Sequence, residues 1–341
     1  MSTGVESIVA AIGRLVERQD LTEDEAAQAM REIMEGRATP AQIAAFLTAL
    51  RMKGETIAEV TGCARVMREK VTPIYAPYPN VIDTCGTGGD GAHTFNISTT
   101  TALVVAGAGI PVAKHGNRAM SSRCGSADLL KELGVAIELP PARVETCLAE
   151  VGIAFLFAPL LHSAMKYAVG PRREIGVRTI FNILGPLTNP AAAKHQLLGV
   201  YARELTELSA RVLANLGSQR AFVVHGADGL DEITTTGETY ITALEEGEVR
   251  SYTIRPEEFG LARVPLAALS GGDAQQNAAI TMGVLSGTRG PQRDIVLLNA
   301  AAAIVVAGVA ADLKTGLQVA ADTIDSGAAL AKLRGLQGFT A

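Results

Sequence analysis

The chain has 341 residues, of which 35 are acidic and 30 are basic, so its formal net charge at pH 7 is −5. No long run of Lys or Arg forms the positive patch typical of nucleic-acid binders, and we expect no nucleic-acid partner. The richest apolar run is shorter than a membrane span and the N-terminal sequence lacks a signal-peptide pattern, so we expect a soluble protein without membrane contact. The cysteines form no C-x-x-C pair, which argues against a zinc site or a disulfide framework and favours a cytoplasmic location.

The N-terminal part of the chain has the pattern of an all-helical module. From Val5 to Lys70 the apolar residues recur at helical spacing. Capping boxes, in which a hydroxyl and a Glu or Gln side chain satisfy free N–H groups at a helix start, are predicted at Thr22 with Glu25, Thr39 with Gln42, and Thr56 with Glu59. The proline-rich segment 72–80 then ends the helical pattern. We predict a helical domain over residues 1–72 and a hinge near Thr72.

After the hinge, short apolar strands alternate with longer helical segments, which is typical of a parallel sheet with crossover helices. Strands are predicted at 80–84, 110–115, 135–139, 196–201, 221–226 and 238–244. Helices are predicted from about residue 98, at 126–134, at 299–308 and within 313–336. Segment 160–190 is rich in Gly, Pro and basic residues and is predicted to be a loop-and-helix connection. The predicted fold class is α/β, with a small all-helical N-terminal domain and a large domain whose mainly parallel central sheet is flanked by helices.

A glycine-rich loop follows the first predicted strand. Gly86, Gly88 and Gly91 fit G-x-G-x-x-G, the pattern of a dinucleotide-binding turn. That fingerprint also needs an acidic residue about 20 positions further on, where this chain has Lys114 and His115. The following sequence NISTTT places hydroxyls at a helix N-terminus, where N–H groups and the helix dipole favour an anion. Phosphate is therefore favoured over a dinucleotide, and a tight turn without a ligand stays as the alternative.

A second polar cluster follows the next strand. In KHGNRAMSSRCGSAD, residues 114–128, Lys114 and Arg118 supply positive charge and Ser126 is expected to cap the next helix. Two such turns at the ends of adjacent parallel strands form the crevice where α/β sheets bind ligands, and a ligand with more than one phosphate fits it. In a later loop, the adjacent carboxylates of Asp231 and Glu232 could hold Mg²⁺ together with substrate phosphates, although adjacent acids in a loop are more often solvated.

The motifs GTGGD, NIST, KHGNR, GSAD, RTIFNILGPLTNP and GLDE occur in this order between the hinge and Glu232. With them, the chain resembles the anthranilate phosphoribosyltransferase family, which joins anthranilate to phosphoribosyl pyrophosphate (PRPP) in tryptophan biosynthesis. The resemblance implies a helical domain over 1–72 with a contribution from about 163–190, and an α/β domain over 73–162 and 191–341. It also implies a homodimer formed through the helical part and an association, seen in some relatives, with an anthranilate synthase subunit.

Site residues are carried over from the family motifs position by position. PRPP is expected to contact Gly86, Gly88, Gly89, Asp90, Thr94, Asn96, Ser98, Thr99, Lys114, Asn117, Ser121, Ser122 and Ser126. Anthranilate is expected to contact Gly86, His115, Asn117, His162 and Arg172. Mg²⁺, as two ions bound with PRPP, is expected at Ser98, Asp231 and Glu232. The chain has Ser163 where the family commonly has proline, which puts the shape of the anthranilate path in question.

No side chain is predicted to act as a general acid or base, because no Ser-His-Asp or Cys-His arrangement is evident and an aromatic amine needs no strong base. From the residues alone, Arg172 and Arg173 are equivalent candidates for the carboxylate ligand. Three other functions stay open: a pyrimidine nucleoside phosphorylase of the same fold, a nucleic-acid-binding relative without catalysis, and an NADP-linked oxidoreductase. The acidic net charge opposes the second.

Overall fold

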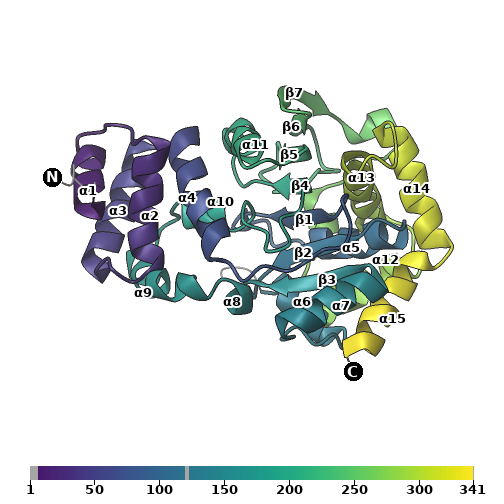
Figure 1. Cartoon of the computed structure of the whole chain (residues 1–341). Coiled ribbons are helices and arrows are strands. Elements are labelled where there is room, and N and C mark those ends of the chain that lie inside the picture. Colours follow the sequence, from purple (N-terminus) through teal and green to yellow (C-terminus); the bar gives the residue numbers. More distant parts are fainter. Residues whose placement is uncertain (1–6, 120–122, 341) are drawn as a thin grey trace.

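The structure is a computed structural model that describes residues 7–119 and 123–340. A group of helices at the N-terminal end stands beside a larger α/β part built on one sheet (Figure 1). This arrangement confirms the predicted fold class. Among the described residues, no helix is both long and apolar enough to cross a membrane.

The N-terminal part consists of α1 (Ile8–Val16), α2 (Glu23–Met34), α3 (Pro40–Lys53) and α4 (Ile57–Lys70). All three predicted capping boxes are confirmed at the starts of α2, α3 and α4. In each box the threonine hydroxyl accepts a hydrogen bond of 3.3 Å from the N–H three residues further on. A cap of this kind stabilises a helix by about 1 kcal/mol, which is why local sequence alone sets these helix starts.

One sheet with strand order β3-β2-β1-β4-β5-β6-β7 forms the centre of the α/β part. Pairing from β3 to β5 is parallel, whereas β6 and β7 continue the sheet in antiparallel pairing. The strands are β1 (Ile82–Gly86), β2 (Val112–Gly116), β3 (Ile153–Phe157), β4 (His195–Gly199), β5 (Arg220–Gly226), β6 (Thr239–Glu245) and β7 (Glu248–Ile254).

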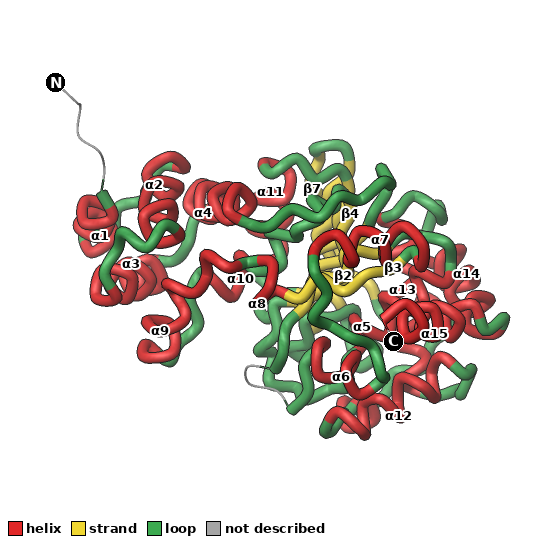
Figure 2. The backbone as a smooth tube through the Cα atoms, turned by 60° about the horizontal axis from the view of Figure 1, so that its bottom comes forward, coloured by secondary structure: helices red, strands yellow, loops and turns green. Residues whose placement is uncertain are grey.

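Helices cover both faces of the sheet (Figure 2). Leu197 and Leu198, adjacent in β4, point to opposite faces and belong to two different apolar cores. The core around Leu198 is continuous with the N-terminal helices and includes Phe46 and Leu47 of α3. The remaining long helices are α5 (Ile97–Gly107), α6 (Ser126–Glu132), α7 (Pro141–Val151), α11 (Leu205–Asn215), α12 (Ala274–Leu285), α13 (Pro291–Val306), α14 (Leu313–Asp325) and α15 (Ala328–Thr340).

Segment 160–190 is a loop-and-helix connection, as predicted. It contains the end of α8 (Ala158–Leu161), the 3-10 turn η1 (Ser163–Met165), α9 (Lys166–Ile175) and α10 (Phe181–Leu184). Helix α9 packs against α2 and α3, beside the N-terminal helices and away from the sheet (Figure 1). Two further 3-10 turns, η2 (Pro256–Phe259) and η3 (Leu266–Leu269), follow β7.

The sequence prediction of the strands was wrong at 135–139. Val135 and Ile137 are buried in alternation, but this segment is an extended loop, and Ala136 N–H donates to the Thr340 hydroxyl of α15 at 3.0 Å. The alternation therefore reflects packing beneath a C-terminal helix and not pairing in a sheet. The strand that pairs with β2 is β3, and both β3 and the edge strand β7 were missed.

Candidate functional site

Most of the predicted site residues lie near the carboxyl ends of the parallel strands, in the strand ends, in the loops that follow and at the starts of helices. Strand β1 lies between β2 and β4, so the order of the strands reverses beside it. Open α/β sheets bind ligands in the crevice outside such a reversal. The glycine loop follows β1, Lys114 lies near the end of β2 with the loop that begins at Asn117 after it, and the loop with the acidic pair follows β5.

The glycine loop needs its glycines for two separate reasons. Gly88, Gly89 and Gly91 have φ of 66°, 74° and 76°, a left-handed conformation that side chains disfavour. Gly86 has a different role, because a Cβ there would lie 2.3 Å from Asp231 Oδ2. The same carboxylate oxygen accepts a hydrogen bond of 2.7 Å from Gly88 N–H. The loop is therefore closely packed against the acidic pair.

Helix α5 begins where the loop ends, and its first turn carries polar residues. Ser98 N–H donates to Glu232 Oε1 at 3.1 Å. The amide of Asn96 is held from two sides, since its Nδ2 donates to Cys124 O at 3.1 Å and its Oδ1 accepts from Asn277 at 2.9 Å. Thr94, earlier in the loop, forms an isolated bridge with Ser270.

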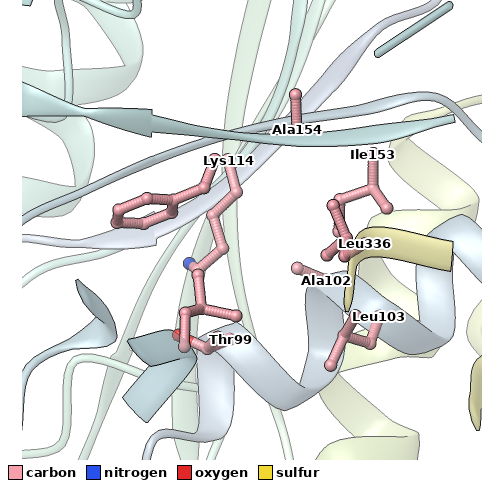
Figure 3. A pocket seen from close by; sticks show the side chains of 9 residues that line it. Thr99, Ala102, Leu103, Lys114, Ile153, Ala154 and Leu336 are labelled. Atoms are coloured by element: carbon pink, nitrogen blue, oxygen red, sulfur yellow. The ribbon is translucent and has the colours of Figure 1, made fainter. Parts of the chain in front are cut away.

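Thr99 is placed differently from its neighbours. Its side chain is buried, and its hydroxyl has no hydrogen-bond partner among the described residues. It lines a void of about 10 Å³ together with Lys114 and apolar side chains of α5, β3 and α15 (Figure 3). The Thr99 side chain therefore lies in the interior, beside Lys114, and not at the surface of the site.

Lys114 brings a buried positive charge to the same place. Its ammonium donates to Thr84 O at 2.5 Å and to the Ser98 hydroxyl at 3.4 Å. Burial lowers the pKa of Lys114, and the Asp83 carboxylate opposes this shift. Asp83 is fully buried, and it accepts from His115 N–H at 3.1 Å and from Asn189 Nδ2 at 2.8 Å. It was not singled out from the sequence, although an acid within an apolar strand is a visible signal.

Asp231, Glu232 and Asp90 form a cluster of negative charge. Desolvation and the charge of Asp90 raise the pKa of Asp231, and desolvation and the charge of Asp231 raise the pKa of Glu232. Such mutual repulsion falls when a cation binds. The donors are hard oxygens, which suit Mg²⁺. Within residues 7–119 and 123–340, no three acidic, His or Cys side chains converge as a complete metal site. An ion held here would need further ligands, and Mg²⁺ often takes these from substrate phosphates.

The loop after β2 departs from the sequence prediction at Ser126. The N-cap of α6 is Gly125, whose N–H donates to Asp128 Oδ2 at 2.9 Å. The Ser126 hydroxyl instead accepts from Asn117 N–H at 3.2 Å and donates to Asn117 O at 3.1 Å. The expected helix cap was therefore wrong, because the hydroxyl holds the turn between β2 and α6. Ser121 and Ser122 lie outside the described residues.

Arg118 lies in the same loop but its charge is already paired. Its guanidinium is 3.2 Å from the Glu138 carboxylate and 3.9 Å from that of Asp128. It also lies 5.6 Å from the centroid of the Phe157 ring. In this structure Arg118 forms surface ion pairs, and Lys114 is the buried cation of the cluster.

Of the residues expected near anthranilate, Gly86 ends β1 and His115 lies in β2. Asn117 follows β2, His162 directly follows α8, and Arg172 lies in α9. The Nε2 atoms of His115 and His162 are 3.1 Å apart, and the ring centroids are 5.0 Å apart. Burial lowers the pKa of His115 to about 3 and that of His162 to about 4, so both rings are neutral at pH 7. Arg172 is half-buried with its guanidinium 5.0 Å from the Phe181 ring centroid, whereas Arg173 is exposed. Arg172 forms no ion pair with a carboxylate of the described residues.

Comparison with known proteins decides the family. The helical-bundle domain of the glycosyl transferase family matches residues 9–71, and the a/b domain of that family matches residues 78–330. The chain is 62% identical to the anthranilate phosphoribosyltransferase of Moorella thermoacetica over 327 residues, which is 96% of both chains. The chain belongs to the anthranilate phosphoribosyltransferase family. The family and the activity that the sequence motifs implied are confirmed.

Solved structures of the family have the same fold. The anthranilate phosphoribosyltransferase of Thermus thermophilus superposes with a TM-score of 0.92 at 44% identity, covering 97% of this chain and 99% of that one. The enzyme from Saccharomyces cerevisiae, solved in complex with PRPP and Mg, superposes with a TM-score of 0.89 at 28% identity and covers 98% and 97%. The glycosyltransferase class predicted from the sequence is therefore confirmed.

Three buried residues around the site were missed by sequence reasoning. Asn299 of α13 forms hydrogen bonds with both backbone groups of Ile233, next to the acidic pair. Its Oδ1 accepts from Ile233 N–H at 3.0 Å, and its Nδ2 donates to Ile233 O at 2.8 Å. Gly199 ends β4, where a Cβ would lie 1.5 Å from Asp231 O. Asn299, Gly199 and Asp83 therefore support the loops of the site through buried contacts with the backbone of Ile233, Asp231 and His115. An amide within the apolar run LNAAAAIVV was a signal for Asn299, whereas nothing local marks Gly199.

Proposed function

We propose that the chain transfers the phosphoribosyl group of PRPP to the amine of anthranilate and releases pyrophosphate, giving N-(5-phosphoribosyl)anthranilate. The observation that supports this most directly is the meeting of the glycine loop with the acidic pair. Gly88 N–H and Ser98 N–H both donate to these carboxylates, at 2.7 and 3.1 Å. Phosphate-binding amides and oxygen ligands for a divalent cation thus occupy one place, as a diphosphate leaving group requires.

The PRPP side of the site uses the glycine loop, the start of α5, Lys114, Asn117 and Ser126. The loop amides and the buried Lys114 ammonium bind the phosphate oxygens, because their charge and dipoles act in a desolvated place. Mg²⁺ held by Asp231, Glu232 and Ser98 would neutralise negative charge that develops on the departing pyrophosphate. The Saccharomyces cerevisiae relative is in complex with PRPP and Mg, which supports this assignment. Two ions are proposed.

Anthranilate is held on the opposite side by Arg172, His115, His162, Asn117 and Gly86. Arg172 presents a guanidinium that no described carboxylate occupies, and a guanidinium can bind the anthranilate carboxylate in a bidentate pair. The neutral imidazoles of His115 and His162 suit an aromatic ring, because they bring no charge to it. The amine keeps its lone pair at neutral pH and attacks C1 of the ribose on the face opposite the leaving group, with inversion.

Several further proposals accompany this function. The division into a helical domain over 1–72 with 163–190, and an α/β domain over 73–162 and 191–341, is supported by the packing of α9 on α2 and α3. The family resemblance supports a homodimer, an association with an anthranilate synthase subunit and a cytoplasmic location. Ser163 lies exposed in η1, directly after His162, where it would border the path of anthranilate.

The experiment that tests the function follows anthranilate fluorescence in a mixture of protein, anthranilate, PRPP and Mg²⁺. We expect the fluorescence to fall only when all components are present. The double variant Asp231→Asn with Glu232→Gln should require more Mg²⁺ for half-maximal rate, and an unchanged Mg²⁺ titration would remove these residues from the metal site. No loss of fluorescence with folded wild-type protein would refute the proposed transfer, and nucleoside phosphorolysis and nucleic-acid binding would be tested next.

A further inference from the structure

Arg178 lies where the glycine loop meets two other parts of the chain. It follows α9 and precedes α10, six residues after Arg172 in the sequence. One nitrogen of its guanidinium, Nη2, donates a hydrogen bond to Gly89 O. The guanidinium also lies 4.4 Å from the centroid of the Tyr201 ring, in the turn between β4 and α11. It is the first residue of the motif RTIFNILGPLTNP, although no site role was predicted for it from the sequence.

Tyr201 connects this contact to the start of the same loop. Its backbone N–H donates to the Thr87 hydroxyl at 3.0 Å, and Thr87 N–H donates to Gly199 O at 2.9 Å. The turn after β4 therefore fixes the beginning of the glycine loop through Thr87. The same turn also contributes the Tyr201 ring, which contacts the Arg178 guanidinium, and Arg178 in turn donates to Gly89 O in the middle of the loop.

The hydrogen bond from Arg178 sets the orientation of one peptide unit. The peptide between Gly89 and Asp90 is trans, so its carbonyl and its N–H point in opposite directions. With Gly89 O directed at Arg178, Asp90 N–H is directed to the other side of the loop. No described residue accepts a hydrogen bond from Asp90 N–H, and it is available to an anion. Gly89, at φ 74°, has little conformational constraint of its own.

Arg178 has no competing charge partner that would explain its position. It is exposed, and it forms no ion pair with a carboxylate of the described residues. Its polar contact goes to a loop carbonyl, and a carbonyl oxygen turned toward a diphosphate would repel it. Fixing that oxygen on the guanidinium removes this repulsion before the ligand arrives.

We propose that Arg178 is a positioning residue for PRPP, which holds the Gly89 carbonyl away from the phosphates and presents Asp90 N–H to them. The inference rests on the proposed function, because it assigns the diphosphate to the glycine loop. Arg178 acts through the loop, and Tyr201 acts through Arg178. Removing either side chain leaves the phosphate-binding groups in place and loosens the peptide that carries one of them.

The first experiment measures amide hydrogen exchange in the ligand-free enzyme. Arg178→Ala should raise the exchange rate of peptides covering residues 84–95 and leave that of the N-terminal helices unchanged. The matched control is Arg203→Ala, which removes an exposed arginine stacked 3.9 Å from the Tyr240 ring centroid and has no contact with the glycine loop. Equal exchange of the loop in Arg178→Ala and in the wild type would overturn the proposal.

The second experiment titrates PRPP with Mg²⁺ into each variant by calorimetry. We expect Arg178→Ala to weaken PRPP binding about tenfold, Arg203→Ala to change it less than about twofold, and Tyr201→Ala to weaken it in the same direction. The double variant Arg178→Ala with Tyr201→Ala should be less impaired than the product of the single effects, since both act on one contact. Unchanged PRPP affinity in Arg178→Ala would refute the positioning role alone, whereas absence of PRPP binding by the wild type would refute the proposed function as well.

Discussion

Replacement of Gly199 by alanine should separate the acidic pair from the glycine loop. A Cβ at Gly199 would lie 1.5 Å from Asp231 O and 2.4 Å from Asp231 C, and ordinary contact begins at 3.4 Å. The backbone of Asp231 would therefore have to move by about 2 Å, which is more than a packed core accepts without cost. Gly199 lies in a strand with φ outside the left-handed region, so an alanine backbone fits there and the effect is purely steric.

Overpacking of a core costs about 1–3 kcal/mol, and a clash with backbone should place Gly199→Ala near the upper end, about 3 kcal/mol. The shift would also move Asp231 away from the position in which it is proposed to hold Mg²⁺, so PRPP affinity with Mg²⁺ should fall at least about tenfold. Urea unfolding measures the first quantity and calorimetry the second.

The matched control for Gly199→Ala is Gly283→Ala in α12, where the nearest atom to the new Cβ would be 3.7 Å away. There, alanine should raise the unfolding free energy by roughly 0.5–1 kcal/mol, because glycine disfavours a helix interior. A Gly199→Ala protein that unfolds within about 0.5 kcal/mol of the wild type and binds PRPP equally well would refute the steric reasoning.

Three further predictions follow from the site. Arg172→Ala should raise the KM for anthranilate about fiftyfold, through loss of a bidentate charged pair, and leave the KM for PRPP within about twofold; equal rises in both would remove Arg172 from the carboxylate site. Asn299→Leu should lower the unfolding free energy in urea by about 3 kcal/mol, because Ile233 N–H and C=O lose their buried partner, and an unchanged midpoint and slope would contradict this. The pKa values of His115 and His162 are lowered in the folded state, to about 3 and about 4, so their contribution to stability is complete above pH 6.5 and decreases as the pH falls toward 4. Between pH 6.5 and 4, the unfolding free energy of His162→Asn in urea should therefore fall less steeply with pH than that of the wild type, by up to about 1.4 kcal/mol per pH unit. Identical slopes for the two proteins would show that His162 is not held neutral.

What the sequence predicted best was local. A capping box involves residues three positions apart, so Thr22, Thr39 and Thr56 marked their helix starts without knowledge of the fold. The strand predicted at 135–139 failed because alternation of apolar residues reports one buried face and does not say what covers it. There the cover includes α15, which ends 204 residues away from Ala136 at Thr340.

The glycine loop shows the same limit within the site. Its composition and the following hydroxyls predicted an anion-binding turn, because positive φ and a helix N-terminus are local properties. The hydrogen bonds that join it to the acidic pair span 143 residues from Gly88 to Asp231 and 134 residues from Ser98 to Glu232. Spacing in one sequence does not show such contacts, and the two segments had been connected only by the expected sharing of Mg²⁺ with substrate phosphates and by the family resemblance.

These two hydrogen bonds also explain why phosphate and metal sites would depend on each other. Gly88 N–H and Ser98 N–H cannot donate fully to a phosphate while they donate to Asp231 and Glu232. Binding of PRPP at these amides must therefore displace the two carboxylates, which then lose their hydrogen-bond donors. This loss disfavours their charged forms further, because burial and neighbouring acids already raise the pKa values of Asp231 and Glu232. A divalent cation compensates that loss and also neutralises the incoming phosphates. The exchange predicts that Mg²⁺ and PRPP bind cooperatively, since each removes the cost of admitting the other.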